Sequence, residues 1–458
     1  MKGRALFEDF PEVSAKAWKQ KIQYELKGKD YNEQMVWESL EGIKVKPFYH
    51  AEDVTNSKAL LATDVPNWKI GHIIYAGNAI MANESALKFL GKGAEAIQFI
   101  IPDEKVDSKL LLKNIDLLSH SIYLSMQFLS KDFIKNLFSK VANANHIFLQ
   151  LDVIDNLSRT GNWFKSLEQD HQDLDELVAL NSNNLLSVDT SLYENAGANM
   201  VQQLAFAMAH ANEYLNHLDN TGKIKNLKSL QFKVSLGGNY FFEIAKLKAL
   251  RILWNTLCEA YNIQIACHIT AIPSKRNKTI YDYNANMLRT TTECMAAVLG
   301  GSNTVFNLPY DSLYHKVNDF AERIALNQLI LLKEESYFDR VSNPTEGSYY
   351  ITALTEQLAE KALILFKSIE KNGGFLAQLK NHSIQNKISD SAKKQADLFN
   401  KGKIVLVGTN KFINEQDRMK GDLELYPFVK RKARKTLITP IIEKRLAETM
   451  EQKRLEDE

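Results

Sequence analysis

The 458-residue sequence predicts an α/β protein built on a (β/α)8 barrel of the TIM type, with an N-terminal arm and a C-terminal helical extension. Eight short apolar runs alternate with stretches of helical periodicity, which is the pattern of such a barrel. The runs are apolar on both faces, as parallel strands are when helices cover them. A doubly wound sheet would need fewer repeats and a glycine-rich first turn. The nearest glycine string, GKGAEA at 91–96, leaves a predicted helix and enters a predicted strand, the reverse of the order that phosphate binding requires.

The predicted strands are short and regularly spaced. They lie at 70–76, 95–101, 121–128, 146–152, 184–190, 232–236, 263–269 and 304–308. Between them, apolar residues recur every three or four positions, as at Met200, Leu204 and Met208, which predicts helices with one buried face. We therefore assign residues 70–310 to the barrel.

Residues 1–69 precede the barrel and predict an amphipathic helix, from about Ser14 to Lys27, followed by an extended arm. The arm is too extended to form a hydrophobic core of its own. Its apolar side chains, Val36, Trp37, Ile43, Val45, Phe48 and Tyr49, need a surface that covers them. We expect this surface to belong to a partner protein; the alternative is that the arm wraps its own barrel.

Residues 311–458 predict a helical extension and a charged tail. Amphipathic spacing covers 312–336, 353–372 and 390–400, and strand-like pieces occur at 347–351 and 403–408. In the tail, a stripe through Ile442, Leu446 and Met450 predicts a solvated helix.

Composition excludes several classes of protein. The 57 Lys and Arg residues nearly balance the 55 Asp and Glu residues. The net charge is therefore too small to indicate nucleic acid or a membrane surface as a partner. The N-terminus has no apolar signal region, and no apolar run is long enough to span a bilayer. Three scattered cysteines fit a reducing compartment, so we expect a cytoplasmic protein.

The candidate site is the set of polar side chains at the predicted C-terminal ends of the strands, where barrel enzymes build their active sites. Its members are Tyr75, Gln150, Asp152, His268 and Asn307, with Asp189 and Thr190 beside them. These side chains could bind an acyl carbonyl or a thioester. The alternative is that they satisfy one another across the barrel mouth.

No catalytic residue and no metal site are predicted. His268 follows Cys267 on a strand, so the two side chains point to opposite faces and cannot act as a base and a nucleophile. The acidic string from Glu168 to Glu176 lacks the glycine of a calcium loop, and its single histidine is too few for zinc.

Long segments of the chain resemble the acyl-CoA mutase family, and within it the small subunits of the methylmalonyl-CoA mutases. They include FEDFPEVSAKAWKQKIQYELKGKDY near the start, FKVSLGGNYFFEIAKLKALRILW at 232–254, NKTIYDYNANMLRTTTECMAAVLGGSNTV at 277–305 and RVSNPTEGSYYI at 340–351. The resemblance implies a barrel that surrounds an acyl-CoA substrate, and a linker that leads to a cobalamin-binding domain. It also implies a large partner subunit that carries adenosylcobalamin, the two chains forming a heterodimer.

Two departures from the family pattern bear on activity. The DxHxxG loop, whose histidine meets cobalt in the family, is absent from the 458 residues. Leu192 stands where the resemblance would place the family's general-acid histidine, and either Ile73 or Tyr75 stands at the position of its catalytic tyrosine. We therefore expect a non-catalytic subunit that binds no cofactor itself. The alternatives are an acyl-CoA-binding barrel with its own cofactor-free chemistry, and a scaffold for another partner.

Overall fold

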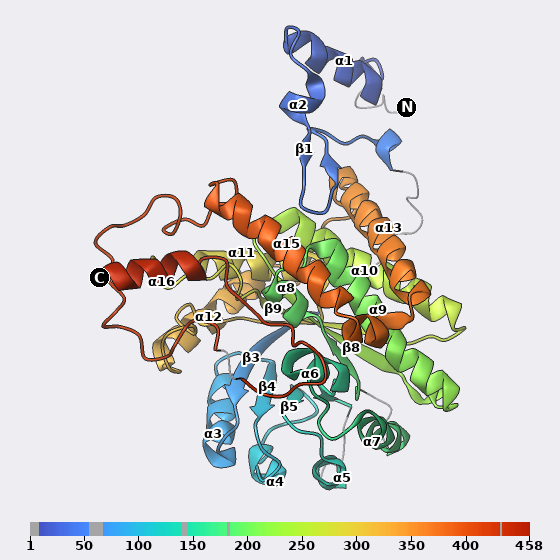
Figure 1. Cartoon of the computed structure of the whole chain (residues 1–458), viewed down its shortest axis with the longest axis vertical. Helices are drawn as coiled ribbons and strands as arrows, with labels where there is room; N and C mark the ends of the chain where they lie inside the picture. Colours follow the sequence, from blue (N-terminus) through green and yellow to red (C-terminus); the bar gives the residue numbers. More distant parts are fainter. Residues whose placement is uncertain (1–8, 55–66, 140–144, 181–183, 431–432) are drawn as a thin grey trace, which may run out of the picture.

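The computed structural model describes residues 9–54, 67–139, 145–180, 184–430 and 433–458. Its centre is a barrel of eight parallel strands surrounded by helices (Figure 1). The strands are β3 (Lys69–Tyr75), β4 (Ala96–Ile101), β5 (Ser121–Met126), β6 (Ile147–Leu149), β7 (Ser187–Asp189), β8 (Ser229–Leu236), β9 (Ala266–Pro273) and β10 (Thr304–Phe306). Every predicted run contributes one of them, so the predicted fold is confirmed.

The barrel closes between its first and last hydrogen-bonded strands. The order is β6-β5-β4-β3-β10-β9-β8-β7, and a parallel bridge between Leu151 and Leu186 joins β6 to β7. The strands are almost wholly buried, because helices cover the outside and side chains fill the inside.

The covering helices follow the strands in the order that a barrel requires. They are α3 (Ala79–Leu90), α4 (Ser108–Leu111), α5 (Lys131–Ser139), α6 (Val153–Thr160), α7 (Leu167–Leu180), α8 (Ser191–Ala196), α9 (Met200–Asn220), α10 (Tyr240–Ala260), α11 (Ala285–Leu299) and α12 (Asp319–Ile330), with a 3-10 turn at Ile224–Asn226. Polar side chains cap several of them. Asn199, for example, caps α9 in a capping box with Gln202.

One predicted strand was shifted from its true position. The run 263–269 was expected to be a strand, whereas β9 covers Ala266–Pro273. Ile263 and Ile265 instead belong to the turn after α10, where the carbonyl of Ile265 accepts a hydrogen bond from the Trp254 indole at 2.9 Å. Their apolar character reflects packing against the core rather than strand pairing.

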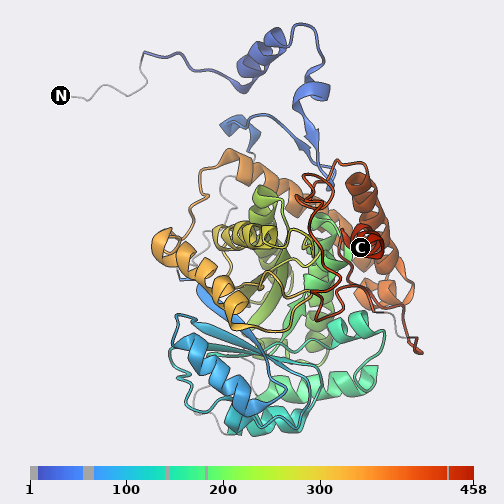
Figure 2. The ribbon, with the colours of Figure 1, turned by 90° about the vertical axis from the view of Figure 1, so that its left-hand side faces the viewer.

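The N-terminal arm projects away from the barrel (Figures 1 and 2). It contains α1 (Ala15–Glu25), α2 (Tyr31–Met35), a short hairpin of β1 (Trp37–Glu38) and β2 (Lys44–Val45), and a 3-10 turn at Ala51–Asp53. Helix α1 has no buried residue, and Trp18 is 53% exposed. Ile43 and Val45 are buried in the chain's own core, so part of the arm does cover its own barrel.

The C-terminal extension is helical: a π-helix at Leu331–Glu335, then α13 (Tyr349–Lys371), α14 (Gly374–Lys380), α15 (Ser383–Asn400) and α16 (Glu448–Asp457). Both predicted strand-like pieces were wrong. The first is the capped start of α13, and the second forms only one bridge, between Val407 and Lys411. Within the described residues, we find no helix with the length and apolarity that a bilayer crossing requires.

The segment 436–447, here called the strap, crosses the barrel face beside α6 and α8. Its backbone N–H groups at Leu437, Ile441 and Lys444 donate to the carbonyls of Gly161, Ser158 and Asn195. The predicted tail helix was therefore only partly right, because these hydrogen bonds hold Ile442 in an irregular segment and the helix begins at Glu448.

Candidate functional site

A cavity of about 500 Å³ opens at the C-terminal ends of the strands. Its lining is mostly polar and includes Gln98, Ser125, Gln150, Asp189, Lys233 and Ser235. These side chains lie on the inward faces of β4, β5, β7 and β8 and in the segment after β6. The cavity therefore occupies the place where barrel enzymes bind their substrates.

A network of charges forms one wall of the cavity. Asp189 is paired with Lys233 at 3.0 Å and with Arg159 at 3.3 Å. Arg159 also contacts Asp155 at 2.7 Å and Glu443 at 2.6 Å. Burial alone would raise the pKa of Asp189, but the charges of Lys233 and Arg159 bring it below its usual range. Asp189 is thus an ionised carboxylate and cannot serve as a general acid near neutral pH.

Three other polar groups at the mouth have no hydrogen-bond partner among the described residues. Gln98 donates from Nε2 to Gln150 Oε1 at 2.9 Å, which leaves Gln98 Oε1 and Gln150 Nε2 unpaired. The hydroxyl of Ser235 is unpaired as well. An acceptor, a donor and a hydroxyl of residues that line the cavity are therefore buried, and each is costly to bury without a partner.

Below the cavity, side chains close the barrel axis. Tyr123, Phe148 and Phe306 pack together with Ala96, Ile73 and Ile272. The rings of Tyr123 and Phe148 stack at 4.6 Å between centroids, and Phe306 meets Tyr123 edge-on at 5.4 Å. We call this set the aromatic layer.

The structure brings two of the predicted site residues to the mouth. Gln150 and Asp152 both line the cavity. The carboxylate of Asp152, however, is fully hydrogen-bonded within the protein. Its oxygens accept hydrogen bonds from His210 at 2.9 Å, Tyr214 at 2.7 Å and the backbone N–H groups of Asp155 and Asp189, both at 2.8 Å. It caps α6 and joins the ends of β6 and β7 to α9, which is a structural role.

Tyr75 lies at the end of β3 and is 61% exposed. It is not among the residues that line the mouth cavity. Two residues earlier on the same face, Ile73 packs against the aromatic layer. Ile73 has no hydroxyl, and the hydroxyl of Tyr75 does not line the cavity.

The expected position of His268 was wrong. Because β9 begins at Ala266, His268 lies near the start of its strand and not at the mouth. Its Nε2 shares a 2.8 Å hydrogen bond with the Tyr123 hydroxyl, which also bonds Thr304 at 2.7 Å. Burial lowers the pKa of His268 to about 3, so the ring is neutral and acts as a polar member of the barrel core.

Asn307 does follow the end of β10, as expected, but its side chain turns outward from the barrel and not into the mouth. Its Nδ2 donates to the carbonyl of Ala325 at 3.0 Å and to Gln328 at 2.9 Å, both on α12. Asn307 therefore fastens a helix to the barrel. A polar side chain after a strand end can point into the barrel or outward to a helix. Alternation along the strand predicts which of the two only if the strand boundary is known to within one residue, and that boundary is hard to place from sequence.

Arg159, Lys233 and Glu443 are the main site residues that the sequence analysis missed. Lys233 interrupts the apolar run FKVSL, and a charge inside a buried strand is a signal that could have found it. Arg159 lies on a helix and Glu443 on the strap, and no local pattern marks either. Leu192, at the expected place of the family acid, is only 1% exposed and packs in the main core.

Comparisons with known proteins agree on one family. The family model for methylmalonyl-CoA mutase matches residues 103–456. The chain is 34% identical to a methylmalonyl-CoA mutase small subunit from Porphyromonas gingivalis, over 89% of this chain and 71% of that protein. It is 26% identical to a methylmalonyl-CoA mutase from Cereibacter sphaeroides, over 86% of this chain and 64% of that protein. A small subunit from Streptomyces virginiae is 36% identical over 44% of this chain and 34% of its own length. The chain therefore belongs to the methylmalonyl-CoA mutase family.

Proposed function

We propose that this chain is a non-catalytic small subunit that pairs with a large, adenosylcobalamin-carrying subunit. Together they would interconvert methylmalonyl-CoA and succinyl-CoA, and this chain would stabilise its partner. The names of two relatives, which call them small subunits, support a large-subunit partner. All three cysteines are free thiols, which fits the cytoplasmic location that we propose.

The aromatic layer carries the proposal. A barrel that surrounds an acyl-CoA needs an open axis, whereas here side chains from six strands fill the axis directly below the mouth. The ring of Tyr123 is fully buried and fixed by His268 and Thr304. Opening this axis would mean separating packed rings and breaking two buried hydrogen bonds, which is costly in a close-packed interior.

The residues at the mouth do not fit adenosylcobalamin. In the family a histidine meets cobalt, but no histidine is among the residues that line the mouth cavity. In addition, the strap lies against α6 and α8, and its Glu443 is held in the mouth by Arg159. We therefore derive no reaction step through the cofactor on this chain.

The arm supplies the partner contact in this proposal. Helix α1 buries none of its own side chains, and Trp18, Tyr24 and Trp37 are more than half exposed. Covering a few such side chains gives about 1.5–3 kcal/mol each before the costs of association. This is enough to contribute to a stable heterodimer.

Activity assays test the catalytic part of the proposal. The purified chain with adenosylcobalamin should show no conversion of methylmalonyl-CoA, and isothermal titration calorimetry should show no uptake of the cofactor. A matched preparation of the chain with its large subunit should be active. Turnover or micromolar cofactor binding by the isolated chain would overturn the proposal.

Deletion of residues 1–50 tests the contribution of the arm. We expect weaker assembly with the large subunit in analytical ultracentrifugation, while circular dichroism shows that the barrel still folds. Ile43→Ala is a useful control, since Ile43 packs on the chain's own core and its loss should affect stability more than assembly. Unchanged assembly of a folded deletion variant would move the interface to the barrel helices or to the C-terminal extension.

A second function is favoured by the unpaired groups at the mouth. Gln98 Oε1, Gln150 Nε2 and the Ser235 hydroxyl could bind the polar groups of a small ligand or of an acyl-CoA end. Titration of a CoA ester into the isolated chain distinguishes this acyl-CoA-binding function from the first. Binding that is lost in the double variant Gln98→Leu, Gln150→Leu would support it, and absence of binding would exclude it.

A further inference from the structure

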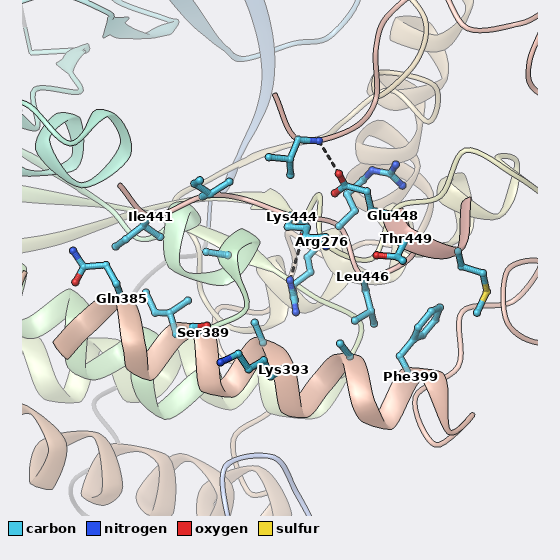
Figure 3. Close-up of a pocket in the computed structure, with 18 of the residues that line it drawn as sticks. Arg276, Gln385, Ser389, Lys393, Phe399, Ile441, Lys444, Leu446, Glu448 and Thr449 are labelled. Carbon is cyan, nitrogen blue, oxygen red and sulfur yellow. Dashed lines mark hydrogen bonds between the residues drawn. The ribbon is translucent and has the colours of Figure 1, made fainter. Parts of the chain in front are cut away.

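A larger cavity lies outside the mouth, between α15, the strap and α16 (Figure 3). Its volume is about 1000 Å³, at the upper end of the range typical of small-molecule sites. We call it the α15 cavity. It plays no part in the proposed function.

The side chains that line the α15 cavity carry more positive than negative charge. Five cationic side chains line it against one carboxylate, Glu448; the five are Arg276, Lys393, Lys444, Arg445 and Lys453. Arg445 is neutralised by Glu451. Glu448 accepts a hydrogen bond from the backbone N–H of Val429 at 2.7 Å. Lys444 and Lys453 have no ion pair among the described residues, and Lys393 only reaches the exposed Asp390 at 3.9 Å.

Arg276 is the buried element of this cavity. Only 8% of it is exposed. Its Nε donates to Gln395 at 2.7 Å and its Nη1 to the carbonyl of Lys444 at 2.8 Å. The guanidinium lies between the strap and α15 (Figure 3). Nη2 has no hydrogen-bond acceptor among the described residues, and no carboxylate there lies within ion-pair distance.

A buried guanidinium with no ion-pair partner is costly. Burial lowers the pKa of Arg276, and only Glu194 opposes this effect. The fork of N–H groups on an arginine matches the oxygens of a phosphate or a carboxylate. The unpaired edge of Arg276, with three exposed lysines lining the same cavity, is therefore suited to a multiply charged phosphate.

Apolar side chains make up much of the remaining lining, beside polar ones such as Gln385, Ser389 and Thr449. Ile388 and Phe399 come from α15, Ile441 and Leu446 from the strap, and Met450 from α16. Small side chains, Ala196, Ala392 and Ala396, leave room between them. This lining suits an organic body attached to the phosphate rather than a bare inorganic ion.

We propose that the α15 cavity binds an organic phosphate, with Arg276, Lys393 and Lys444 around the phosphate and the apolar walls around the organic body. The site joins three segments that are distant in sequence. Occupation would thus fasten the strap to α15 and to the loop after β9.

The test is isothermal titration of the full chain with two probes, ADP and inorganic pyrophosphate. We expect ADP to bind in the micromolar range and pyrophosphate more weakly, because only ADP reaches the apolar walls. The double variant Lys393→Met, Lys444→Met should weaken ADP binding by roughly tenfold or more, since it removes two positive charges from the phosphate end of the site. Lys387→Met, an exposed lysine of the same helix outside the cavity, is the matched control and should bind as the wild type does.

Arg276→Gln should abolish binding, with circular dichroism as a check on folding. If this variant fails to fold, the lysine variants still decide the question. Three results would overturn the proposal: no binding of either probe at millimolar concentration, equal binding by the lysine double variant and the wild type, or uptake of an acidic peptide in place of both probes. Equal affinity for ADP and pyrophosphate would overturn the role of the apolar walls.

Discussion

The interior of the barrel differs above and below the level of Phe148. Above it, the mouth holds a charged network and three unpaired polar groups around a cavity of about 500 Å³. Below it, the aromatic layer fills the axis, and His268, which is hydrogen-bonded to Tyr123 of this layer, is neutral. The same alternating strands build both levels. The lower level contributes stability through packing, whereas the upper level gives up some stability because it buries three polar atoms without a partner.

Phe148→Ala should have the largest effect on stability. The substitution removes a ring from the middle of the aromatic layer and leaves a cavity, so we expect the free energy of unfolding to fall by about 3–5 kcal/mol. Denaturant unfolding measures this loss. Phe412→Ala, at a ring that is mostly exposed, is the control and should change little. A small loss for Phe148→Ala would show that the axis can open more easily than its packing indicates.

Asp152→Ala should have the next largest effect, although Asp152 lies at the mouth. It leaves several buried donors without an acceptor and removes the cap of α6, so we expect a loss of about 2–4 kcal/mol. Asp132→Ala on the exposed face of α5 is the matched control. If Asp152→Ala left the free energy of unfolding almost unchanged, this carboxylate would not be needed for the fold and would again be a candidate ligand-binding group.

His268 should make stability depend on pH. In the unfolded chain its pKa is near 6.5, whereas burial lowers the pKa in the folded protein to about 3. The unfolded state then binds more protons between these values, so stability falls as the pH falls below about 6.5, by about 1.4 kcal/mol per pH unit at most. His268→Gln should flatten this dependence between pH 7 and 5.5, while His50→Gln at the surface should keep it. Equal pH profiles for the wild type and His268→Gln would contradict a neutral buried ring.

Glu443→Gln should have the smallest effect. The pair with Arg159 is partly exposed, and Arg159 keeps two other carboxylates, so we expect the stability to change by less than about 1 kcal/mol. The sensitive measurement is hydrogen exchange at the strap amides of Ile441 and Lys444, which should become faster. Glu456→Gln on α16 controls for the loss of charge alone. Unchanged exchange would mean that the backbone hydrogen bonds alone hold the strap over the mouth.

Sequence alone determined the architecture, because periodicity and burial are local properties. The eight apolar runs gave all eight strands, and polar residues at their ends indicated the side of the barrel on which Gln150, Asp152 and Asp189 lie. Long shared segments gave the family. These inferences need only the order and spacing of residues.

Tertiary structure decided which of those polar residues are available. Asp152 is used by His210 and Tyr214 of α9, and Asn307 by α12, and neither helix can be assigned to these side chains from local sequence. His268 was misplaced because the boundary of its strand moved by three residues, which transferred the ring from the mouth to the core. Glu443 reaches Arg159 across 284 positions in the chain. The physical reason is the same in each case: a buried polar group is satisfied by whichever partner the fold brings close, and that partner is usually distant in sequence.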